Sequence, residues 1–299
     1  MKKLNVNRTI ILGALLLLAV VSKAQQAKVA AAIDFLQHNN LDSAKVNINI
    51  AIANHETADD AYTWYIRGFV YKAIYNKIDK DNNKAPERIE SLNSFKKSLA
   101  LDVSKEHFTD NIKSIKYLLS TIYNDAADAL DPVDYKVAIE LFNTYQEYYK
   151  LIDPSPEVSQ KKEIEFDLAL ASVYSKVLET DKKANSKFLT LAKNLYTKIL
   201  ALDPDNISAN YGIASLYYNQ AVNLILTQAV DLDIVNLNAI QDNSVQLFKE
   251  SLPFMEKAYT LDPQRTDAIE GLSGIYYSLG EEEKSIEYKK KLEEIKKPK

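Results

Sequence analysis

Five oxygen-bearing side chains between residues 79 and 90 have the spacing of a calcium-binding loop. They are Asp79, Asp81, Asn83, Glu87 and Glu90, at positions 1, 3, 5, 9 and 12 of such a loop. Position 6 normally needs glycine for its sharp turn, and here it is Lys84, which would place a positive charge beside the ion. We therefore favour a polar loop between two helices, with a calcium site as the alternative, and predict no metal.

A second group of carboxylates lies at three-residue steps: Asp125, Asp128, Asp131 and Asp134. These could form a cluster for a cation or for acid-base chemistry. The other interpretation is a solvated helix end followed by a second helix that begins at Pro132. We favour the solvated helix end, because runs of charge usually face water.

Other residues with catalytic or ligating potential are few. The three histidines, His38, His55 and His107, have no partner at metal-ligand spacing, and the chain contains no cysteine. It has no Gly-x-Ser-x-Gly elbow, no glycine-rich phosphate loop and no His-Glu-x-x-His motif. The sequence therefore predicts no catalytic residue and no cofactor.

A pattern of small and bulky residues recurs six times along the chain in two alternating halves. In the first half a small residue is followed three places later by an aromatic one: Ala32 and Phe35, Gly68 and Tyr71, Ser120 and Tyr123, Ala171 and Tyr174, Ala214 and Tyr217, Ser273 and Tyr276. The second half has steps of four and three: Ala44, Ile48, Ala51; Ser91, Phe95, Ser98; Ala138, Phe142, Tyr145; Ala192, Tyr196, Ile199; Ser251, Met255, Ala258; Ser285, Lys289, Leu292. Such steps place these residues, called the anchors below, on one face of a helix. The chain is predicted to be all-α and built from antiparallel helix pairs.

The pattern resembles the tetratricopeptide repeat (TPR) family. Trp64, Gly68 and Tyr71 stand at the family's spacing, and Leu-Asp-Pro at 202–204 and 261–263 resembles its repeat ends. The resemblance extends over roughly residues 27 to 297 and implies a right-handed superhelical solenoid of about six repeats. It also implies a non-enzymatic protein whose task is to bind another protein.

The departures from a regular repeat predict where the chain carries inserted loops or a terminal repeat. Charged and Asn-rich stretches at 78–86, 180–184 and 231–243 are predicted to be inserted loops. Lys289 replaces a bulky anchor in the last unit, as expected for a terminal repeat with a polar outer face. No linker divides the chain, so residues 25–299 are predicted to form one solenoid.

The first 24 residues have the composition of a secretory signal peptide. Lys2, Lys3 and Arg8 flank an apolar run over 9–21, and Ser22-Lys23-Ala24 provides a small-x-small cleavage site. An uncleaved anchor is the alternative, but 13 helical residues span only about 20 Å of a hydrocarbon core of roughly 30 Å. We expect cleavage after Ala24, export to the periplasm, the cell envelope or the medium, and no membrane insertion afterwards.

Charge and surface aromatics indicate the partner class. Removing four positive charges leaves 33 basic and 41 acidic residues, a net charge of -8, which disfavours nucleic acid and anionic lipid. Tyrosine combines a rigid apolar face with a hydroxyl, as at many protein interfaces. The residues expected to line a concave groove for a protein or peptide are Tyr62, Tyr65, Phe69, Lys72, Tyr117, Asn124, Tyr211, Tyr218 and Tyr277. The alternative function is a ligand-binding receptor or an enzyme whose pocket is built by the inserted loops.

Overall fold

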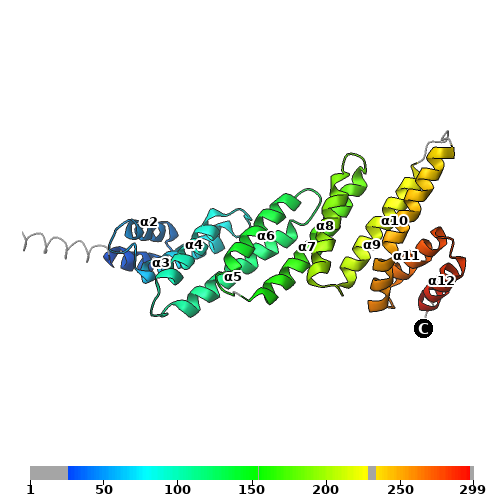
Figure 1. The fold of residues 1–299 in the computed structure, drawn as a ribbon. Coiled ribbons are helices and arrows are strands. Elements are labelled where there is room, and N and C mark those ends of the chain that lie inside the picture. Colours follow the sequence, from blue (N-terminus) through cyan, green and yellow to red (C-terminus); the bar gives the residue numbers. More distant parts are fainter. Residues whose placement is uncertain (1–25, 154, 228–233, 297–299) are drawn as a thin grey trace, which may run out of the picture. The chain divides into compact units, whose positions relative to one another are not determined.

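The protein is helical throughout the part that the structure describes. The computed structural model covers residues 26–153, 155–227 and 234–296, and no strand occurs among them (Figure 1). The prediction of an all-α chain is thus confirmed. The segment 1–24 lies outside these residues, as do Pro154 and 228–233, so the signal peptide stays a prediction. None of the described helices combines the length and the apolar composition needed to cross a membrane.

The helices group into two compact units. Unit 1 comprises the described residues up to 128 together with 137–156, and unit 2 comprises 129–136 and the residues from 157 on. Unit 1 contains a helix over 26–37, α2 (Leu41–Ile52), α3 (Ala61–Ile74) with its π-helical extension η1 (Tyr75–Asp79), α4 (Pro86–Leu101), α5 (Phe108–Asp128) and most of α6 (Tyr135–Tyr149). Unit 2 contains α7 (Pro156–Thr180), α8 (Lys187–Leu202), α9 (Ile207–Leu226), α10 (Ile234–Leu261), α11 (Thr266–Ser278) and α12 (Glu282–Lys296). The single solenoid over 25–299 stays a prediction.

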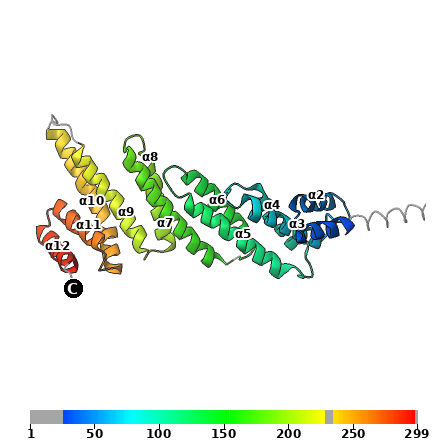
Figure 2. The ribbon, with the colours of Figure 1, turned by 180° about the vertical axis from the view of Figure 1, so that it is seen from behind.

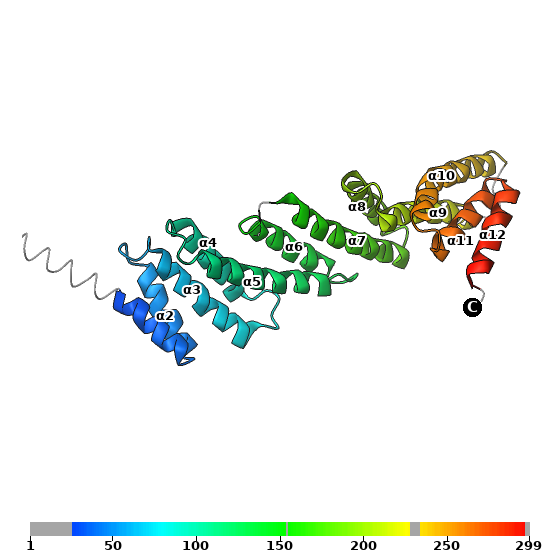
Figure 3. The same cartoon turned by 90° about the horizontal axis from the view of Figure 1, so that it is seen from below.

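Successive helices form TPR-like antiparallel pairs within each unit. In unit 1, α3 packs on α4, and Figure 2 shows them beside α2. In unit 2, α9 and α10 form a long hairpin (Figure 1), and α11 and α12 form the last pair (Figure 3). The described helices make six sequential pairs, as the six-fold anchor pattern predicts.

Local chemistry begins and ends these helices. Asn40, Asp60 and Asn206 precede α2, α3 and α9, and each side chain accepts a hydrogen bond from the backbone N–H three residues on. Pro86 occupies the first turn of α4, where its missing N–H costs nothing. Gly280 has φ of 78°, and the N–H of Glu281 donates to the carbonyl of Tyr276. This left-handed glycine ends α11 and turns the chain into α12.

The anchors hold the two helices of a pair together. The Ser91 hydroxyl donates to the carbonyl of Gly68 at 2.8 Å. In later pairs the hydroxyl of Ser251 donates to Ala214 and that of Ser285 donates to Ser273, at 2.8 and 2.9 Å. A Cβ at position 68 would lie only 2.4 Å from the Phe95 ring, so α3 and α4 approach too closely for any residue but glycine. Small residues thus allow the two helices of a pair to pack closely, and serine hydroxyls hold the helices together by hydrogen bonds.

Most predicted anchors are buried. The buried anchors of unit 2 include Ala171 with Tyr174 and Ala192 with Tyr196. In α12 only Ser285 is buried, and Lys289 is exposed, as expected of a terminal repeat. The repeat register is confirmed at these positions.

In the third pair the register is wrong at Ser120 of α5, whereas Ala138, Phe142 and Tyr145 of α6 are buried as predicted. Ser120 is exposed and donates to the carbonyl of Tyr117 within α5. The buried face of α5 instead carries Leu118, Leu119 and Ile122. The aliphatic side chains lie on two neighbouring rows of α5, and they determine which face packs inward more strongly than one small residue does. Helix α5 is therefore rotated about its own axis relative to the predicted register.

The predicted loop at 231–243 is also wrong where the structure describes it. Helix α10 begins at Ile234 and runs for 28 residues to Leu261. Ile234, Leu237 and Ile240 continue the helical spacing through the polar stretch, and the Ser244 hydroxyl donates to the carbonyl of Ile240. The other predicted loops are confirmed as breaks: turns separate η1 from α4 and α7 from α8.

Candidate functional site

Aromatic side chains of α3 and the start of α5 form a continuous row in unit 1. Tyr62, Tyr65 and Phe69 lie on one side of α3, and His107 just before α5 joins them. The ring of Tyr65 stacks on His107 with centroids 4.6 Å apart and meets Phe69 edge-on at 4.9 Å. Tyr62 lies 5.3 Å from the same histidine ring. These four residues with Lys72 and Tyr117 are called the aromatic face below.

Hydrogen bonds from the neighbouring helix hold the aromatic face in place. The Tyr65 hydroxyl donates to Asp110 Oδ2 at 3.2 Å, and the Tyr117 hydroxyl donates to Asn76 Oδ1 at 2.7 Å. Burial raises the pKa of Tyr65, and the negative charge of Asp110 raises it further. The bonded hydroxyls leave the rings few alternative orientations.

Lys72 closes the row at its far end. Its Nζ lies 5.3 Å from the Phe69 ring centroid and 5.0 Å from that of Tyr117, and it donates to Ser114 Oγ at 3.3 Å. Burial lowers the pKa of Lys72, and the nearby cation Lys113 lowers it further. The positive charges of Lys72 and Lys113 therefore lie near each other, and Asp110, bonded to Tyr65, adds a carboxylate to the same face.

The structure brings five of the predicted groove residues together. Tyr62 and Tyr117 are 41% and 37% exposed, and Tyr65, Phe69 and Lys72 are half-buried beside them. Asn124 is exposed two turns further along α5. The sequence analysis missed His107, because it weighed histidine only as a metal ligand. The available signal was the position of His107, directly before α5 and three residues before Asp110.

In unit 2 the predicted groove residues divide among three environments. Tyr211 lines a cavity. Tyr218 packs into α11, where a Cβ at Gly274 would meet its hydroxyl at 2.6 Å, so it serves helix packing. Tyr277 is 66% exposed on α11, with Lys289 Nζ 5.6 Å from its ring centroid. The aromatic residues of unit 2 thus do not assemble into one row.

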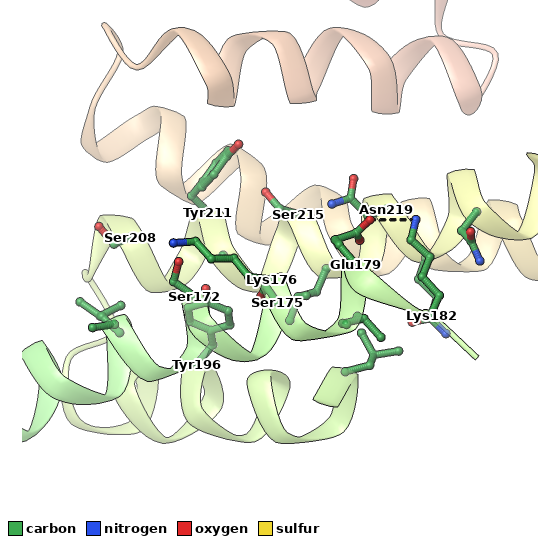
Figure 4. A pocket seen from close by; sticks show the side chains of 18 of the residues that line it. Ser172, Ser175, Lys176, Glu179, Lys182, Tyr196, Ser208, Tyr211, Ser215 and Asn219 are labelled. Carbon is green, nitrogen blue, oxygen red and sulfur yellow. Dashed lines mark ion pairs between the residues drawn. The ribbon is translucent and has the colours of Figure 1, made fainter. Parts of the chain in front are cut away.

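A cavity of about 910 Å³ lies between α7, α8 and α9 of unit 2 (Figure 4). Its apolar lining comes from leucines and an alanine: Leu168, Ala169, Leu178, Leu189 and Leu216. Its polar lining includes hydroxyls, amides and four charged side chains: Ser172, Ser175, Ser186, Tyr196, Ser208, Tyr211, Ser215, Asn219, Gln220, Asn223, Glu165, Lys176, Glu179 and Lys182. Helices build most of this cavity, and of its lining residues Lys182 lies in a predicted insertion, with Glu179 and Ser186 at its edges. This cavity was not predicted from the sequence, because its small lining residues, such as Ala169, Ser172 and Ser215, lie beside the anchors and belong to no motif.

The residues with calcium-loop spacing do not converge on one point: Asp79 lies beside Glu87, whereas Glu90 faces Arg67 of α3. Glu90 pairs with Arg67 at 2.6 Å, and Glu87 pairs with Lys45 at 3.1 Å. Within residues 26–153, 155–227 and 234–296 no group of three or more histidine and acidic side chains could hold a metal ion. The geometry supports the interpretation of a polar loop.

The aspartate row has structural roles that differ along its length. Asp125 accepts from Arg88 at 2.6 Å, and Arg88 is only 1% exposed, so Asp125 is the partner of a buried cation and only partly solvated. Arg88 also donates to the Tyr75 hydroxyl and to the carbonyl of Asn83, which explains its burial. Asp131 accepts from two backbone N–H groups, those of Asp134 and Val133, which lower its pKa.

Comparisons with known proteins show likeness of fold only. No protein-family model and no curated protein sequence matches the chain. Among solved structures, PilF of Pseudomonas aeruginosa is 12% identical with a TM-score of 0.35, and the match covers 92% of each chain. A MamA structure is 16% identical with a TM-score of 0.33, covering 77% of this chain and 91% of that one. PilW, a type IV pilus biogenesis factor, is 14% identical with a TM-score of 0.30, covering 91% and 93%.

Proposed function

We propose that this chain is a non-enzymatic scaffold that binds a protein segment on the aromatic face of unit 1. The observation that carries the proposal is a row of ordered, partly exposed rings contributed by two successive first helices, α3 and α5. Aromatic side chains are enriched at protein interfaces, and rings already held in one orientation lose little entropy on binding. TPR-like helix pairs suit such a role, because they present extended surfaces rather than closed active sites.

The charges beside the aromatic face indicate the chemistry of the partner. The positive charge of Lys113 repels that of Lys72 and lowers the pKa of Lys72. A carboxylate from a partner would relieve that repulsion. We therefore infer that the bound segment has apolar or aromatic side chains that contact the rings and an acidic residue that pairs with the two lysines.

The place of action proposed is the bacterial cell envelope. The support is the signal-peptide pattern of residues 1–24, with its apolar run and its small-x-small site before Gln25. The intact mass of the exported protein tests this: we expect a chain that begins at Gln25. A mass that retains residues 1–24 would contradict cleavage.

Site-specific cross-linking tests the scaffold role. A photo-reactive amino acid at Tyr62 is compared with one at Ile286, a similarly exposed position on α12. We expect a defined cross-linked species from Tyr62 alone, which disappears when Phe69→Ala is added. Equal cross-linking from both positions, or a species insensitive to Phe69→Ala, would contradict the proposal.

A receptor for a small ligand is the second candidate function. The observation in its favour is the cavity of unit 2, whose volume lies within the roughly 300 to 1,000 Å³ typical of ligand sites. This cavity differs from the predicted loop-built pocket, because helices supply most of its walls.

A further inference from the structure

The cavity of unit 2 has an apolar side formed from three helices. Leu168 and Leu178 of α7, Leu189 of α8 and Leu216 of α9 contribute to its lining. Burying a hydrocarbon chain against such residues is favourable by roughly a factor of four in affinity for each methylene group. The cavity therefore has the surface to hold an alkyl chain or a similar apolar body.

The charges on its walls are almost all paired. Lys182 lies 3.2 Å from Glu179, and Glu165 lies 2.7 Å from Lys162. Lys176 also lines the cavity, and within the described residues it has neither an ion pair nor a hydrogen bond. The lining thus carries one positive charge that no neighbour neutralises.

Hydroxyl groups surround this lysine. In Figure 4 the Lys176 side chain runs back along α7 between Ser172 and Tyr211, the direction expected of a long side chain on a helix. Across the described part of the chain, the side chains of Ser172, Ser208 and Tyr211 make no hydrogen bond. Lys176, Ser172 and Ser208 are exposed, so they lie at the rim of the cavity. One cation and several hydroxyls without a partner in the described chain form there a complementary site for a single anionic group.

We propose that this cavity binds a small amphipathic anion, with a carboxylate at Lys176 and an aliphatic body against the leucines. An uncharged molecule would gain no charge-assisted contact and leave Lys176 to the solvent that already reaches it, and a cation would meet a like charge. The cavity and the aromatic face are formed by different residues in different units. A failure of this proposal would therefore leave the proposed scaffold function untouched, and the reverse also holds.

Binding of straight-chain probes to the full chain tests the proposal. Decanoate, kept below its micelle concentration, is compared by calorimetry with decanol and decylamine. We expect decanoate to bind about tenfold or more tightly than decanol, as a charge-assisted hydrogen bond contributes. Shortening the tail to octanoate should weaken binding by about sixteenfold, as two methylene groups predict. Equal affinities for decanoate and decanol, no dependence on chain length, or no binding of decanoate would overturn the proposal.

Matched variants locate the anion and the tail. Lys176→Met should reduce decanoate affinity to that of decanol, whereas Lys182→Met should change it little because Lys182 pairs with Glu179. Ala169→Phe and Ser215→Phe fill the cavity from opposite walls and should each abolish binding of decanoate, with helicity checked by circular dichroism. Equal losses in the two lysine variants, or full binding by folded forms of both filled variants, would place the ligand elsewhere and overturn the proposal.

Discussion

The aromatic face and the cavity occupy equivalent places in two units of similar architecture. Each lies between the first helices of successive pairs, α3 and α5 in unit 1, α7 and α9 in unit 2. In unit 1 these positions carry Tyr65, Phe69 and His107, whose rings meet and fill the space. In unit 2 the residues Ser172 and Ser215 follow the anchors Ala171 and Ala214 as Phe69 follows Gly68, and these small side chains leave the space open. Side-chain volume at a few positions thus decides between a contact surface and a hollow.

The partners of the polar groups differ in the same way. Tyr65, Tyr117 and Lys72 are all satisfied within unit 1. The hydroxyls of Ser172 and Tyr211 and the ammonium of Lys176 make no such bond to described residues. A surface that is already ordered suits a macromolecular partner, whereas unsatisfied groups in a cavity suit a ligand that supplies their partners.

The largest expected effect comes from removing the buried guanidinium that pairs with Asp125 in unit 1. Arg88→Met removes a buried guanidinium and leaves Asp125 without its partner. Because Asp125 keeps some contact with water, we expect the low end of the range for such losses, about 3 kcal/mol of unfolding free energy. Urea unfolding measures it. The control is Lys257→Met, whose pair with Asp205 is exposed and should matter little. A similar small loss in both variants would show that Arg88 does not stabilise unit 1.

Two neighbouring residues of α9 separate packing from the cavity in unit 2. Ala214 is fully buried against α10, whereas Ser215 lines the cavity. Ala214→Leu should lower the unfolding free energy by about 1 to 3 kcal/mol through overpacking. Ser215→Leu should leave it nearly unchanged, because the added atoms enter open space. Thermal unfolding of the two variants provides the measurement, and the reverse order would contradict the helix phase described for α9.

Partner binding provides the corresponding test in unit 1. Tyr65→Ala or Phe69→Ala should weaken binding by about 2 kcal/mol, the loss typical of an interface hot spot, while the helical fold is kept. Tyr277→Ala, a change to an exposed tyrosine of unit 2, is the matched control. Once the cross-linked partner is identified, its affinity for each variant can be measured by calorimetry. Unchanged affinity in both unit 1 variants would exclude the aromatic face as the working surface.

The smallest expected effect is a pH dependence in unit 2. Backbone hydrogen bonds lower the pKa of Asp131 in the folded state. The group therefore contributes stability above its unfolded pKa of about 3.9, and this contribution is lost as pH falls through the folded pKa. Asp131→Asn should reduce the drop in Tm between pH 5 and pH 3. An identical drop in the variant would assign the acid sensitivity to other carboxylates.

The helical anchors were predictable because their information is local. Gly68, Ala171 and Ala214 lie at helical spacing from bulky partners, and close packing of two helices demands small residues there. The prediction failed at Ser120, where a small residue lay beside a stronger aliphatic stripe. It failed again at 234–243, where polar residues obscured an apolar period that continues to Ile240.

The sequence by itself determined the all-helical class, the pairing of successive helices and five members of the aromatic face. Periodicity and residue size are properties of one helix, so they can be read along the chain. Only the tertiary structure decided that His107 stacks on Tyr65, that Arg88 is buried on Asp125, and that α7 and α9 enclose a cavity. Each depends on the facing side chains of helices distant in sequence, because space between helices is filled or left open by the sum of both surfaces.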